Sequence, residues 1–444
     1  MLKFGFAKED ITPAYGIPLC GYFNPRPNKG AFDNLAIKAA AFETSNGEKA
    51  VIISYDLCLL PACEVKKLEK AIADANINMA GKILFSCTHT HTGPYTGNLF
   101  DFDADKDYMD LLATKTVFAV KNALNSLAPA EMYTTKTSCE TLAYNRRFVM
   151  KNGKVLTNPG KLNPDIAYPE GPTDPEIPLM AIKQEGKIVF LMANISNHTD
   201  TIGGDYTSAD WPGRMEHYIQ NDFGYDVPVM TLIAPQGNIN HFNVKTSGEQ
   251  SSYEEAKRIG KAYANVLLSC LYQLEKVDDL DIVCDEITFE APYLQVSDAE
   301  YNEAKAVYEE NKDAVMAGGR DFTSEDIARG VPFVKKFFAE RLIECRENPI
   351  LEKRFERIPA VKFGKSLGIV GLPAEPFVEI GLEIKKASPF ALTMVSALTQ
   401  GEVGYVGLPK NYGIGGYETA PSRSNADPSV GEAFIKYGIE ILNK

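Results

Sequence analysis

The hydrophobic pattern of the first third of the chain alternates between short apolar runs and longer stretches with helical spacing. Nearly continuous apolar runs at residues 35–43 and 50–55 predict two strands. Apolar positions at helical spacing predict helices at residues 63–75 and 108–127, with an apolar strand at 83–85 between them. This order of strand, helix, strand and helix favours an α/β layer with a partly parallel sheet, whose carboxyl edge is where ligands usually bind.

Further strands and helices are predicted in the rest of the chain. Ser297-x-x-Glu300 is a capping box, and charged amphipathic helical stretches follow it. We interpret residues 297–356 as a helical insertion, either a lid over a site or a plain structural outgrowth. The expected fold class is α/β, a mixed β-sheet core flanked by helices, in one domain spanning residues 1–444. The other predicted elements are strands at 179–183, 188–193, 229–235 and 390–398 and a helix at 252–274.

Composition and charge narrow the class of protein and its partners. The chain has 444 residues, of which 45% are apolar and 24% charged, as in ordinary soluble globular proteins. The net charge of −13 argues against nucleic acid and anionic membrane surfaces as partners, because like charges repel. No stretch approaches the roughly 18 apolar residues of a spanning helix, and the charged start Lys8-Glu9-Asp10 is unlike an export signal. We therefore expect a cytoplasmic protein without stable membrane insertion.

The cysteines are scattered and include no Cys-x-x-Cys pair. This distribution favours reduced, buried thiols over disulfides. Cys87 stands beside two histidines and is an alternative metal ligand, but packing is the more common role of such a thiol. The eight are Cys20, Cys58, Cys63, Cys87, Cys139, Cys270, Cys284 and Cys345.

Three of the five histidines follow apolar strands. His89 and His91 come directly after one strand, and His198 comes after another. Where the chain bends at a strand end, the rings of His89 and His91 need not have the same role, so one can hold a metal while the other faces substrate. Polar residues that merely end a strand would look the same, but His198 repeats the pattern and strengthens the metal hypothesis. Glu375 also follows an apolar strand, and imidazole and carboxylate groups both suit zinc.

Two other candidate groups lie in loop-rich segments. Arg146 and Arg147 are adjacent within residues 139–180, where proline and glycine are dense. They are either part of a solvated face or include one guanidinium turned inward to hold an oxyanion or carboxylate. Tyr405 and Tyr417 lie in a glycine-rich segment, in which tyrosines usually pack or bind.

Together these motifs resemble the catalytic domain of the neutral/alkaline non-lysosomal ceramidase family. The resemblance extends over most of the chain. Its most specific feature is the pair Tyr405 and Tyr417, which are twelve residues apart like the family's two active-site tyrosines. The motifs, in order, are Asp10-Ile-Thr-Pro, Thr88-His-Thr-His-Thr-Gly-Pro94, Asn145-Arg146, Asp174-Pro175, His198, Gly371-Leu-Pro-Ala-Glu375, Tyr405 and Tyr417-Glu418.

The resemblance implies a zinc hydrolase that cleaves an amide bond by metal-activated water. One zinc ion per chain would make water acidic enough to attack a carbonyl group at neutral pH. On the substrate side, one histidine would move protons or donate to the oxyanion, and an arginine and a tyrosine would be further donors. The implied zinc ligands are His89, His198, Glu375 and Tyr405, and the implied catalytic residues are His91, Arg146 and Tyr417.

Two departures from the family point to a different substrate. Ceramidases carry a Ser-Asn-x-Gly-Asp loop where this chain has Ala234-Pro235-Gln236-Gly237-Asn238, and no immunoglobulin-like C-terminal domain is expected before Lys444. We expect a small or lipid-like N-acyl substrate other than ceramide itself. Three alternatives remain open: an esterase, a non-catalytic protein that binds zinc, and a protein without a metal.

Overall fold

The larger of two stacked sheets forms one layer of the core. The computed structural model describes residues 2–22, 26–97, 102–315, 324–420 and 426–444. Within these residues, the sheet has the strand order β14-β13-β12-β7-β1-β4-β5-β6, and β16 pairs with β7. The outer pairs β5–β6 and β13–β14 are parallel, and the inner pairs are antiparallel. The strands are β1 (Leu2–Asp10), β4 (Ala36–Glu43), β5 (Lys49–Tyr55), β6 (Ile83–Cys87), β7 (Ala128–Ser138), β12 (Glu176–Gln184), β13 (Lys187–Ile195), β14 (Val229–Ile233) and β16 (Glu275–Lys276).

The second sheet covers one face of the first. Its order is β17-β18-β19-β21, with β19 and β21 parallel. Phe42 of the first sheet packs edge-on against Phe363 of the second, with ring centroids 5.1 Å apart, and apolar side chains from both sheets fill the space between them. The four strands are β17 (Ile282–Glu290), β18 (Phe355–Phe363), β19 (Leu367–Gly371) and β21 (Leu392–Ser396).

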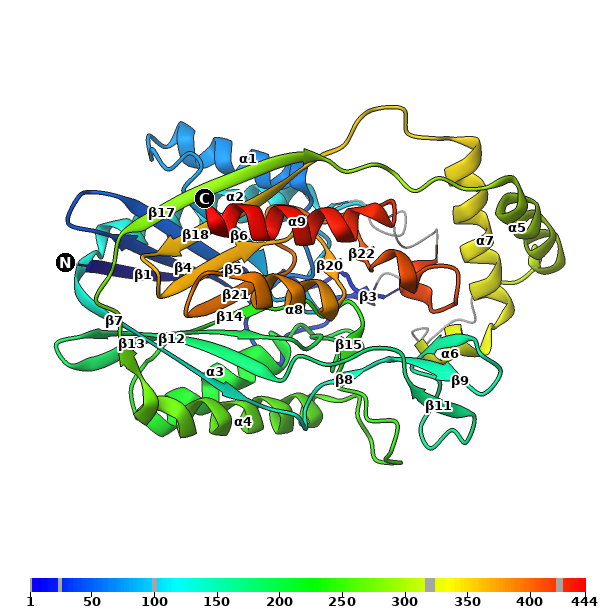
Figure 1. Ribbon diagram of the computed structural model, residues 1–444, viewed down its shortest axis with the longest axis horizontal. Helices are drawn as coiled ribbons and strands as arrows, with labels where there is room; N and C mark the ends of the chain where they lie inside the picture. Colours follow the sequence, from blue (N-terminus) through cyan, green and yellow to red (C-terminus); the bar gives the residue numbers. More distant parts are fainter. Residues whose placement is uncertain (1, 23–25, 98–101, 316–323, 421–425) are drawn as a thin grey trace.

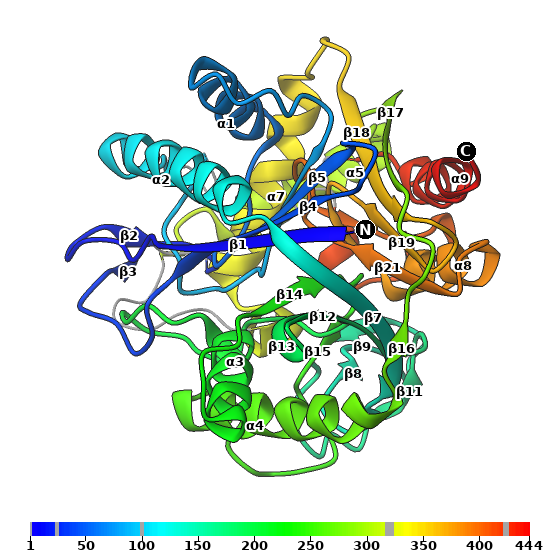
Figure 2. The ribbon, with the colours of Figure 1, turned by 90° about the vertical axis from the view of Figure 1, so that its left-hand side faces the viewer.

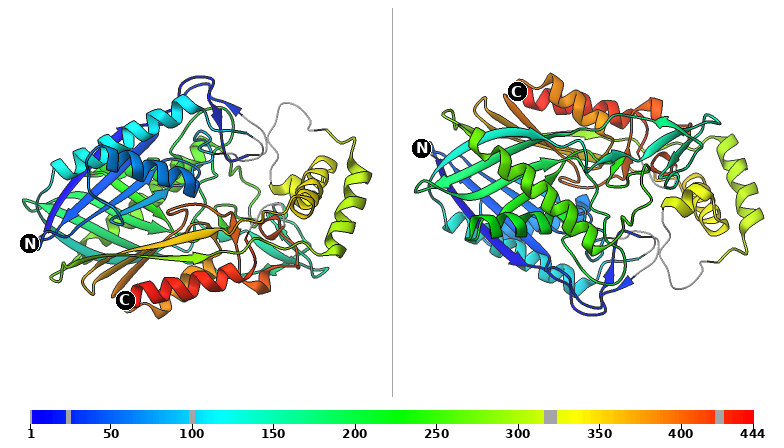
Figure 3. Two further views of the ribbon diagram at one scale, coloured as in Figure 1. Left: turned by 90° about the horizontal axis from the view of Figure 1, so that it is seen from above. Right: turned by 90° about the horizontal axis from the view of Figure 1, so that it is seen from below.

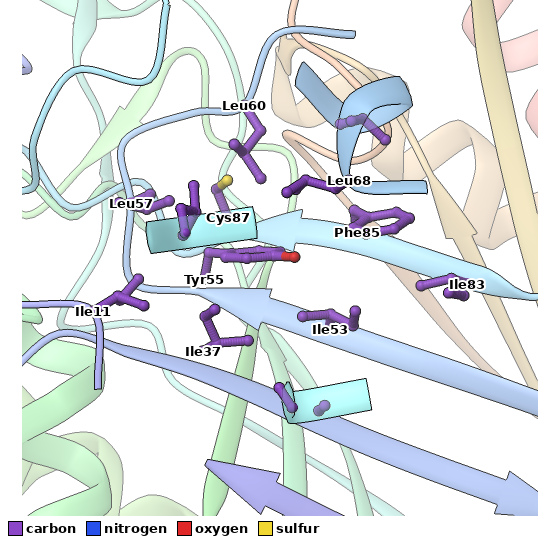
Figure 4. Packing of buried hydrophobic residues seen from close by; sticks show 14 of the residues in the cluster. Ile11, Ile37, Ile53, Tyr55, Leu57, Leu60, Leu68, Ile83, Phe85 and Cys87 are labelled. Carbon is purple, nitrogen blue, oxygen red and sulfur yellow. The ribbon is translucent and has the colours of Figure 1, made fainter. Parts of the chain in front are cut away.

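Helices cover the outer face of each sheet, so the molecule has an α-β-β-α arrangement (Figures 1 and 2). Two helix pairs lie on the first sheet at its two ends, and a third pair lies on the second sheet. Helix α1 buries Val65, Leu68 and Ile72 at helical spacing against the first sheet, within the packed core that Figure 4 shows around Tyr55 and Phe85. The helices are α1 (Ala62–Asp74), α2 (Lys106–Asn125), α3 (Asp210–Phe223), α4 (Tyr253–Cys270), α8 (Val378–Ala387) and α9 (Ser429–Asn443).

The first sheet curls so that the ends of its parallel strands meet the end of β21. Ser86 Oγ of β6 lies 3.0 Å from Ser396 Oγ of β21. On the other side of β21, Ala397 N donates to Ile233 O of β14 (2.8 Å). The carboxyl ends of parallel strands from both sheets therefore gather in one place, as in other α/β proteins whose ligands bind at strand ends.

The predicted helical insertion forms one end of the molecule, away from the N-terminus (Figure 3). It contains α5 (Asp298–Asn311), α6 (Ser324–Arg329) and α7 (Pro332–Glu347), and residues 316–323 within it lie outside the described residues. The predicted capping box is confirmed: Ser297 Oγ accepts from Glu300 N, and the Glu300 carboxylate accepts from Ser297 N.

Short strands and 3-10 helices complete the fold. Most of these short elements lie in the segments where dense proline and glycine residues predict loops. No helix in the part of the chain that the structure describes has both the length and the apolar character needed to cross a lipid bilayer. The short elements are β2 (Pro18–Leu19), β3 (Arg26–Pro27), β8 (Tyr144–Asn145), β9 (Arg147–Met150), β10 (Val155–Thr157), β11 (Ile166–Pro169), β15 (Ile239–Asn240), β20 (Glu375–Pro376), β22 (Tyr405–Val406) and 3-10 helices at Leu271–Gln273, Pro409–Asn411 and Tyr417–Thr419.

The α/β fold class is confirmed, and two details differ from the expectation. The core contains two stacked sheets, because apolar side chains of β17 and β18 pack onto the first sheet. The expectation that all cysteines are buried is wrong for Cys63, which is exposed near the start of α1, and for three partly exposed thiols. Cys87 is packed in the core, as expected. The partly exposed thiols are Cys139, Cys284 and Cys345.

Candidate metal centre

Three side chains of metal-ligand type converge at the gathered strand ends. His89 follows β6, His198 follows β13, and Glu375 begins β20. The two histidine Nε2 atoms lie 3.0 Å apart, and Glu375 Oε2 lies 3.0 Å from His89 Nε2 and 3.5 Å from His198 Nε2. All three side chains are buried. The structure thus brings together three of the four predicted ligands, and their binding of a metal stays a prediction.

The spacing of these three atoms fits a tetrahedral metal ion. Ligand atoms about 2.0–2.2 Å from a tetrahedral zinc lie roughly 3.3 Å from one another. His89 Nδ1 lies 2.7 Å from Cys58 O, and His198 Nδ1 lies 3.4 Å from Gln236 O. Because a carbonyl oxygen only accepts, each Nδ1 carries a proton, and each ring presents an Nε2 lone pair to its neighbours when it is neutral. Glu375 Oε2 is buried and makes no hydrogen bond of normal geometry with the described residues, as expected of an atom that a metal would satisfy.

The backbone at His89 is held in an uncommon conformation. Its φ of 66° lies in the left-handed region, which residues other than glycine occupy mainly where surrounding contacts impose it. Two contacts do so here: His89 N donates to Leu57 O (2.9 Å), and the ring donates to Cys58 O. The segment after β5 therefore fixes both the main chain and the ring of His89.

The charges of the cluster favour neutral histidines around an ionised carboxylate. Burial and the nearby Arg146 guanidinium lower the pKa of His198 to about 3. Burial alone would raise the pKa of Glu375, but His89, His198 and Arg146 hold it well below its usual value. His89 is the exception, because the attraction of Glu375 outweighs burial and raises its pKa. Since metal ligands must be deprotonated, a metal would compete with the proton that Glu375 favours on His89.

Tyr405, the fourth predicted ligand, stands next to the third. Strand β22 pairs with β20 in parallel register, with Tyr405 opposite Glu375, and residues paired in this way project to the same face of a sheet. Burial, and then the charge of Glu375, raise the pKa of Tyr405 well above its usual value.

His91 lies against the cluster but makes different contacts. Its Nε2 is 3.3 Å from His89 Nε2, and burial together with His89 and His198 lowers its pKa well below the usual value. Arg26 Nη2 donates to His91 O (2.5 Å), which holds the main chain. Gly21 packs so closely that a Cβ there would lie 2.7 Å from the His91 ring. His91 is thus a neutral imidazole fixed from behind.

Arg146 is the guanidinium that turns inward. The guanidinium carbon of Arg146 lies 5.3 Å from the ring centroids of both Tyr405 and Tyr417, and the two tyrosine hydroxyl groups are 3.5 Å apart. Arg147 is buried as well, so the interpretation of this arginine pair as a solvated face is wrong. Two carboxylates, Glu170 and Glu418, offset the charge of Arg147 in the interior.

A cavity of about 500 Å³ connects this cluster to the helical insertion. The predicted residues His89, His91, Glu375 and Tyr405 line its inner end. The opposite wall comes from residues 293–296, from α7 and from residues 348–354. The wall side chains include Tyr293, Leu294, Phe337, Arg341, Glu344, Ile350 and Arg354. The cavity has the size of a site for a small organic molecule.

Comparisons with known proteins show similarity to ceramidases in part of the sequence and in the fold. No protein-family model matches the chain. A stretch of 143 residues is 31% identical to neutral ceramidase B of Dictyostelium discoideum, and it covers 30% of this chain but only 20% of that relative. The crystal structure of neutral ceramidase from Pseudomonas aeruginosa matches with a TM-score of 0.71 at 18% identity, over 99% of this chain and 74% of that one. A structure of a ceramidase complexed with C2 matches with the same TM-score and coverage at 16% identity.

The chain has a ceramidase-like fold. It has the neutral ceramidase fold over nearly its whole length, so the resemblance expected from the motifs is confirmed.

The segment 234–238, where this ceramidase-like chain departs from the family, supports the site through its main chain. Gln236 O accepts from His198, and Gly237 O accepts from Arg146 Nη2 (2.7 Å). The Asn238 side chain anchors the segment, since its Oδ1 accepts from Val378 N (2.8 Å) at the start of α8. These backbone contacts do not depend on the serine and aspartate of the family loop.

Sequence reasoning missed several polar groups near the cluster. Asp200 Oδ1 lies 3.2 Å from His241 Nδ1, and the charges of His198 and His241 outweigh burial and lower the pKa of Asp200. Glu402 lines the cavity, where burial and Glu375 raise its pKa to about 7. His241 and Glu402 each follow a strand-like apolar run, but nothing in their spacing separates them from ordinary loop residues.

Cys58 forms a second group of ligand-type atoms with His89 and His91. A hydrogen bond with Cys20 and burial raise the pKa of the Cys58 thiol well above its usual value. The thiol lies 3.7 Å from His89 Nδ1, and this nitrogen donates to Cys58 O and so has no lone pair to offer a metal. The group of His89, His198 and Glu375 is therefore the better candidate.

Proposed function

We propose that this protein is a zinc-dependent hydrolase that cleaves the amide bond of an N-acyl substrate. His89, His198 and Glu375 would hold the metal, with Tyr405 as the fourth ligand. The observation that carries the proposal is the convergence of two imidazole nitrogens and one carboxylate oxygen within 3.0–3.5 Å, at the inner end of a cavity. The neutral ceramidase fold supports it, because the relatives that the chain matches are named as neutral ceramidases.

A bound zinc ion would polarise a carbonyl group and make water more acidic, which is the chemistry that amide hydrolysis requires. The residues of the chain have separate roles. His91 is neutral and fixed from behind, so it can accept a proton from water and pass it to the leaving amine. Arg146 and Tyr417 lie on one side of the cluster and can donate hydrogen bonds to the developing oxyanion.

The substrate we propose is a small or lipid-like N-acyl compound other than ceramide. The wall of the cavity mixes apolar side chains such as Leu294 and Phe337 with charged ones such as Arg341 and Glu344. A wall of this kind suits an amphiphilic molecule with polar groups along its length better than two long alkyl chains.

The experiment that tests the proposal combines metal content with turnover. Plasma emission should find about one zinc per chain in the purified wild type, and 4-nitroacetanilide should be hydrolysed as a generic amide probe. The double variant His89→Ala/His198→Ala should lose both. His217→Ala is the matched control, because this exposed histidine on α3 bonds Asn221 and lies outside the cavity.

Three results would change the conclusion. Absence of metal from the folded wild type would remove the metal centre. Bound zinc without turnover of any short N-acyl compound would favour the non-catalytic metal binder. Turnover of 4-nitrophenyl acetate but of no amide would favour the esterase.

A further inference from the structure

A single buried carboxylate, that of Glu418, lies between the two inward arginines. Glu418 Oε1 is 3.0 Å from Arg146 Nε, and Oε2 accepts from Arg147 Nη1 (3.0 Å). Thr157 Oγ1 also donates to Oε2, at 2.6 Å. The side chain has no exposure to solvent. Glu418 is therefore the point where three separate segments of the chain meet.

Burial makes this carboxylate necessary for the charges around it. Arg146 and Arg147 are adjacent in sequence and both buried, so their positive charges would repel each other without an anion between them. Glu170 also pairs with Arg147, but it makes no ion pair with Arg146 among the described residues. Removing Glu418 would leave Arg146 as a buried charge without its carboxylate partner, whereas removing Glu170 would not.

The same carboxylate contacts the two groups that we propose as hydrogen-bond donors to the oxyanion, one directly and one through its neighbour in sequence. Arg146 Nη2 donates to Gly237 O, and Glu418 Oε1 attracts the guanidinium from the Nε side in an ion pair without hydrogen-bond geometry, so the group is held from two directions. Tyr417 directly precedes Glu418, and its ring centroid lies 5.3 Å from the Arg146 guanidinium carbon. The anchoring of Glu418 thus places both Arg146 and the main chain that carries Tyr417.

The segment before Tyr417 is fitted closely to this network. Gly416 has φ of 84°, and a Cβ there would lie 2.1 Å from Arg147 Nη1. Arg147 Nη2 donates to Gly415 O (3.0 Å). The arginine that Glu418 pairs with therefore also binds the loop of Tyr417, and displacement of the carboxylate would move both.

We propose that Glu418 is a positioning residue, which acts through Arg146 and Tyr417 by holding them where they donate to the reacting carbonyl group. This inference rests on the proposed function. Glu418 is buried and touches neither a metal ligand nor the substrate. Under this proposal its loss would nevertheless slow the chemical step selectively.

The test is Glu418→Gln, which keeps the shape of the side chain and removes its charge. With 4-nitroacetanilide as the probe, kcat should fall by about 10- to 100-fold, a part of the roughly 10²–10³ that loss of an oxyanion donor costs. KM should change by less than about three-fold, because the interaction lost is one made in the transition state. Zinc content should stay at the wild-type value. Glu418→Asp keeps the charge and should recover part of kcat.

Glu170→Gln is the matched control, since it removes the other buried partner of Arg147 and leaves Arg146 paired. A kcat for Glu418→Gln equal to that of Glu170→Gln would overturn the inference while leaving the proposed function intact. No turnover by the wild type would overturn both.

Thr157→Val is a second variant, which tests the positioning role in case Glu418→Gln does not fold. It removes one hydrogen bond to Glu418 and keeps all charges. A kcat about three- to ten-fold below the wild type, at unchanged KM, would support the positioning role. A kcat equal to that of the wild type would overturn it.

Discussion

The two sides of the cavity are built in different ways. On the inner side, His89, His198 and Glu375 are buried at the ends of strands, and each is tied to a neighbouring segment of main chain. The opposite wall is formed by α7 and its flanking segments, whose charges pair near the surface. Arg341 pairs with Glu344 three residues on within α7, at 3.0 Å. Exposed pairs of this kind contribute little to stability.

Because of this difference, we expect the inner side to determine the chemical step and the wall to determine which substrate binds. Groups that must stand within a few tenths of an ångström of one another lie on the rigid part of the fold. The wall that meets the rest of the substrate belongs to an insertion whose residues can change without disturbing the cluster. Variants on the inner side should therefore alter metal binding and kcat, and variants on the wall should alter KM.

The largest effect is expected for Glu375→Gln. The substitution keeps the volume and removes the charge that faces both histidines. Changes to groups that only orient a metal ligand weaken metal binding by about 10- to 100-fold. Loss of a charged ligand should therefore lower the metal affinity by ~10² or more. Turnover should fall with the metal affinity. Competition with a chelator measures the affinity. Wild-type zinc affinity in this variant would contradict the ligand role of Glu375.

His91→Ala should lower turnover and leave the metal in place. His91 lies beside the cluster but is held by Arg26 and Gly21 on its far side, so its removal opens space without removing a ligand. We expect kcat to fall by about 10²–10³, the usual cost of losing a donor or proton carrier at the reacting group. Stopped assays on zinc-loaded protein measure this. Unchanged kcat would exclude His91 from the mechanism.

Glu356, a buried residue of β18 that pairs with Arg354 of the cavity wall, should make stability depend on pH. Burial raises its pKa to about 7 in spite of Arg354, which is 3.5 Å away. The folded protein therefore holds the proton more tightly than the unfolded chain, and stability should fall as pH rises from 4.5 to about 7. Glu356→Gln should stabilise the protein at pH 8 by up to about 3 kcal/mol and change it little at pH 4.5.

Urea unfolding at both pH values measures this effect. Glu352→Gln, at an exposed position four residues earlier, is the control and should change stability by less than about 0.5 kcal/mol at either pH. A stabilisation by Glu356→Gln that is equal at pH 4.5 and pH 8 would contradict the assignment.

Much of the inner side could be predicted from the sequence. Apolar runs that end in His89, His198 and Glu375 are local signals, and strand ends gather at one edge in α/β proteins. The partners that orient these groups could not be predicted. Cys58 O and Gln236 O act through the main chain, which leaves no trace in side-chain identity. Tyr405 was found only because its distance from Tyr417 resembles a known family.

The second sheet and the wall escaped prediction for other reasons. Strand β17 alternates in burial along its length and is separated in sequence from β18 by the whole helical insertion, so no turn signal joins them. The insertion itself was predicted from its capping box and charge pattern. That α7 faces the cavity depends on long-range packing, which periodicity does not report. Phe337 and Phe338 are adjacent, yet only the first of them lines the cavity.

This pair of phenylalanines allows the smallest prediction. Phe337→Ala should raise KM by about three- to ten-fold and change kcat by less than about two-fold, because the wall binds ground state and transition state alike. Phe338 is also half-buried but lies outside the cavity lining. Phe338→Ala should leave KM unchanged and lower the stability of the protein by about as much as Phe337→Ala does. Steady-state kinetics with a short and a longer N-acyl probe measure both variants. A fall in kcat for Phe337→Ala at unchanged KM would mean that the insertion takes part in the chemical step. The inner side would then not be the part of the cavity that alone determines kcat, and the wall would not act on KM alone.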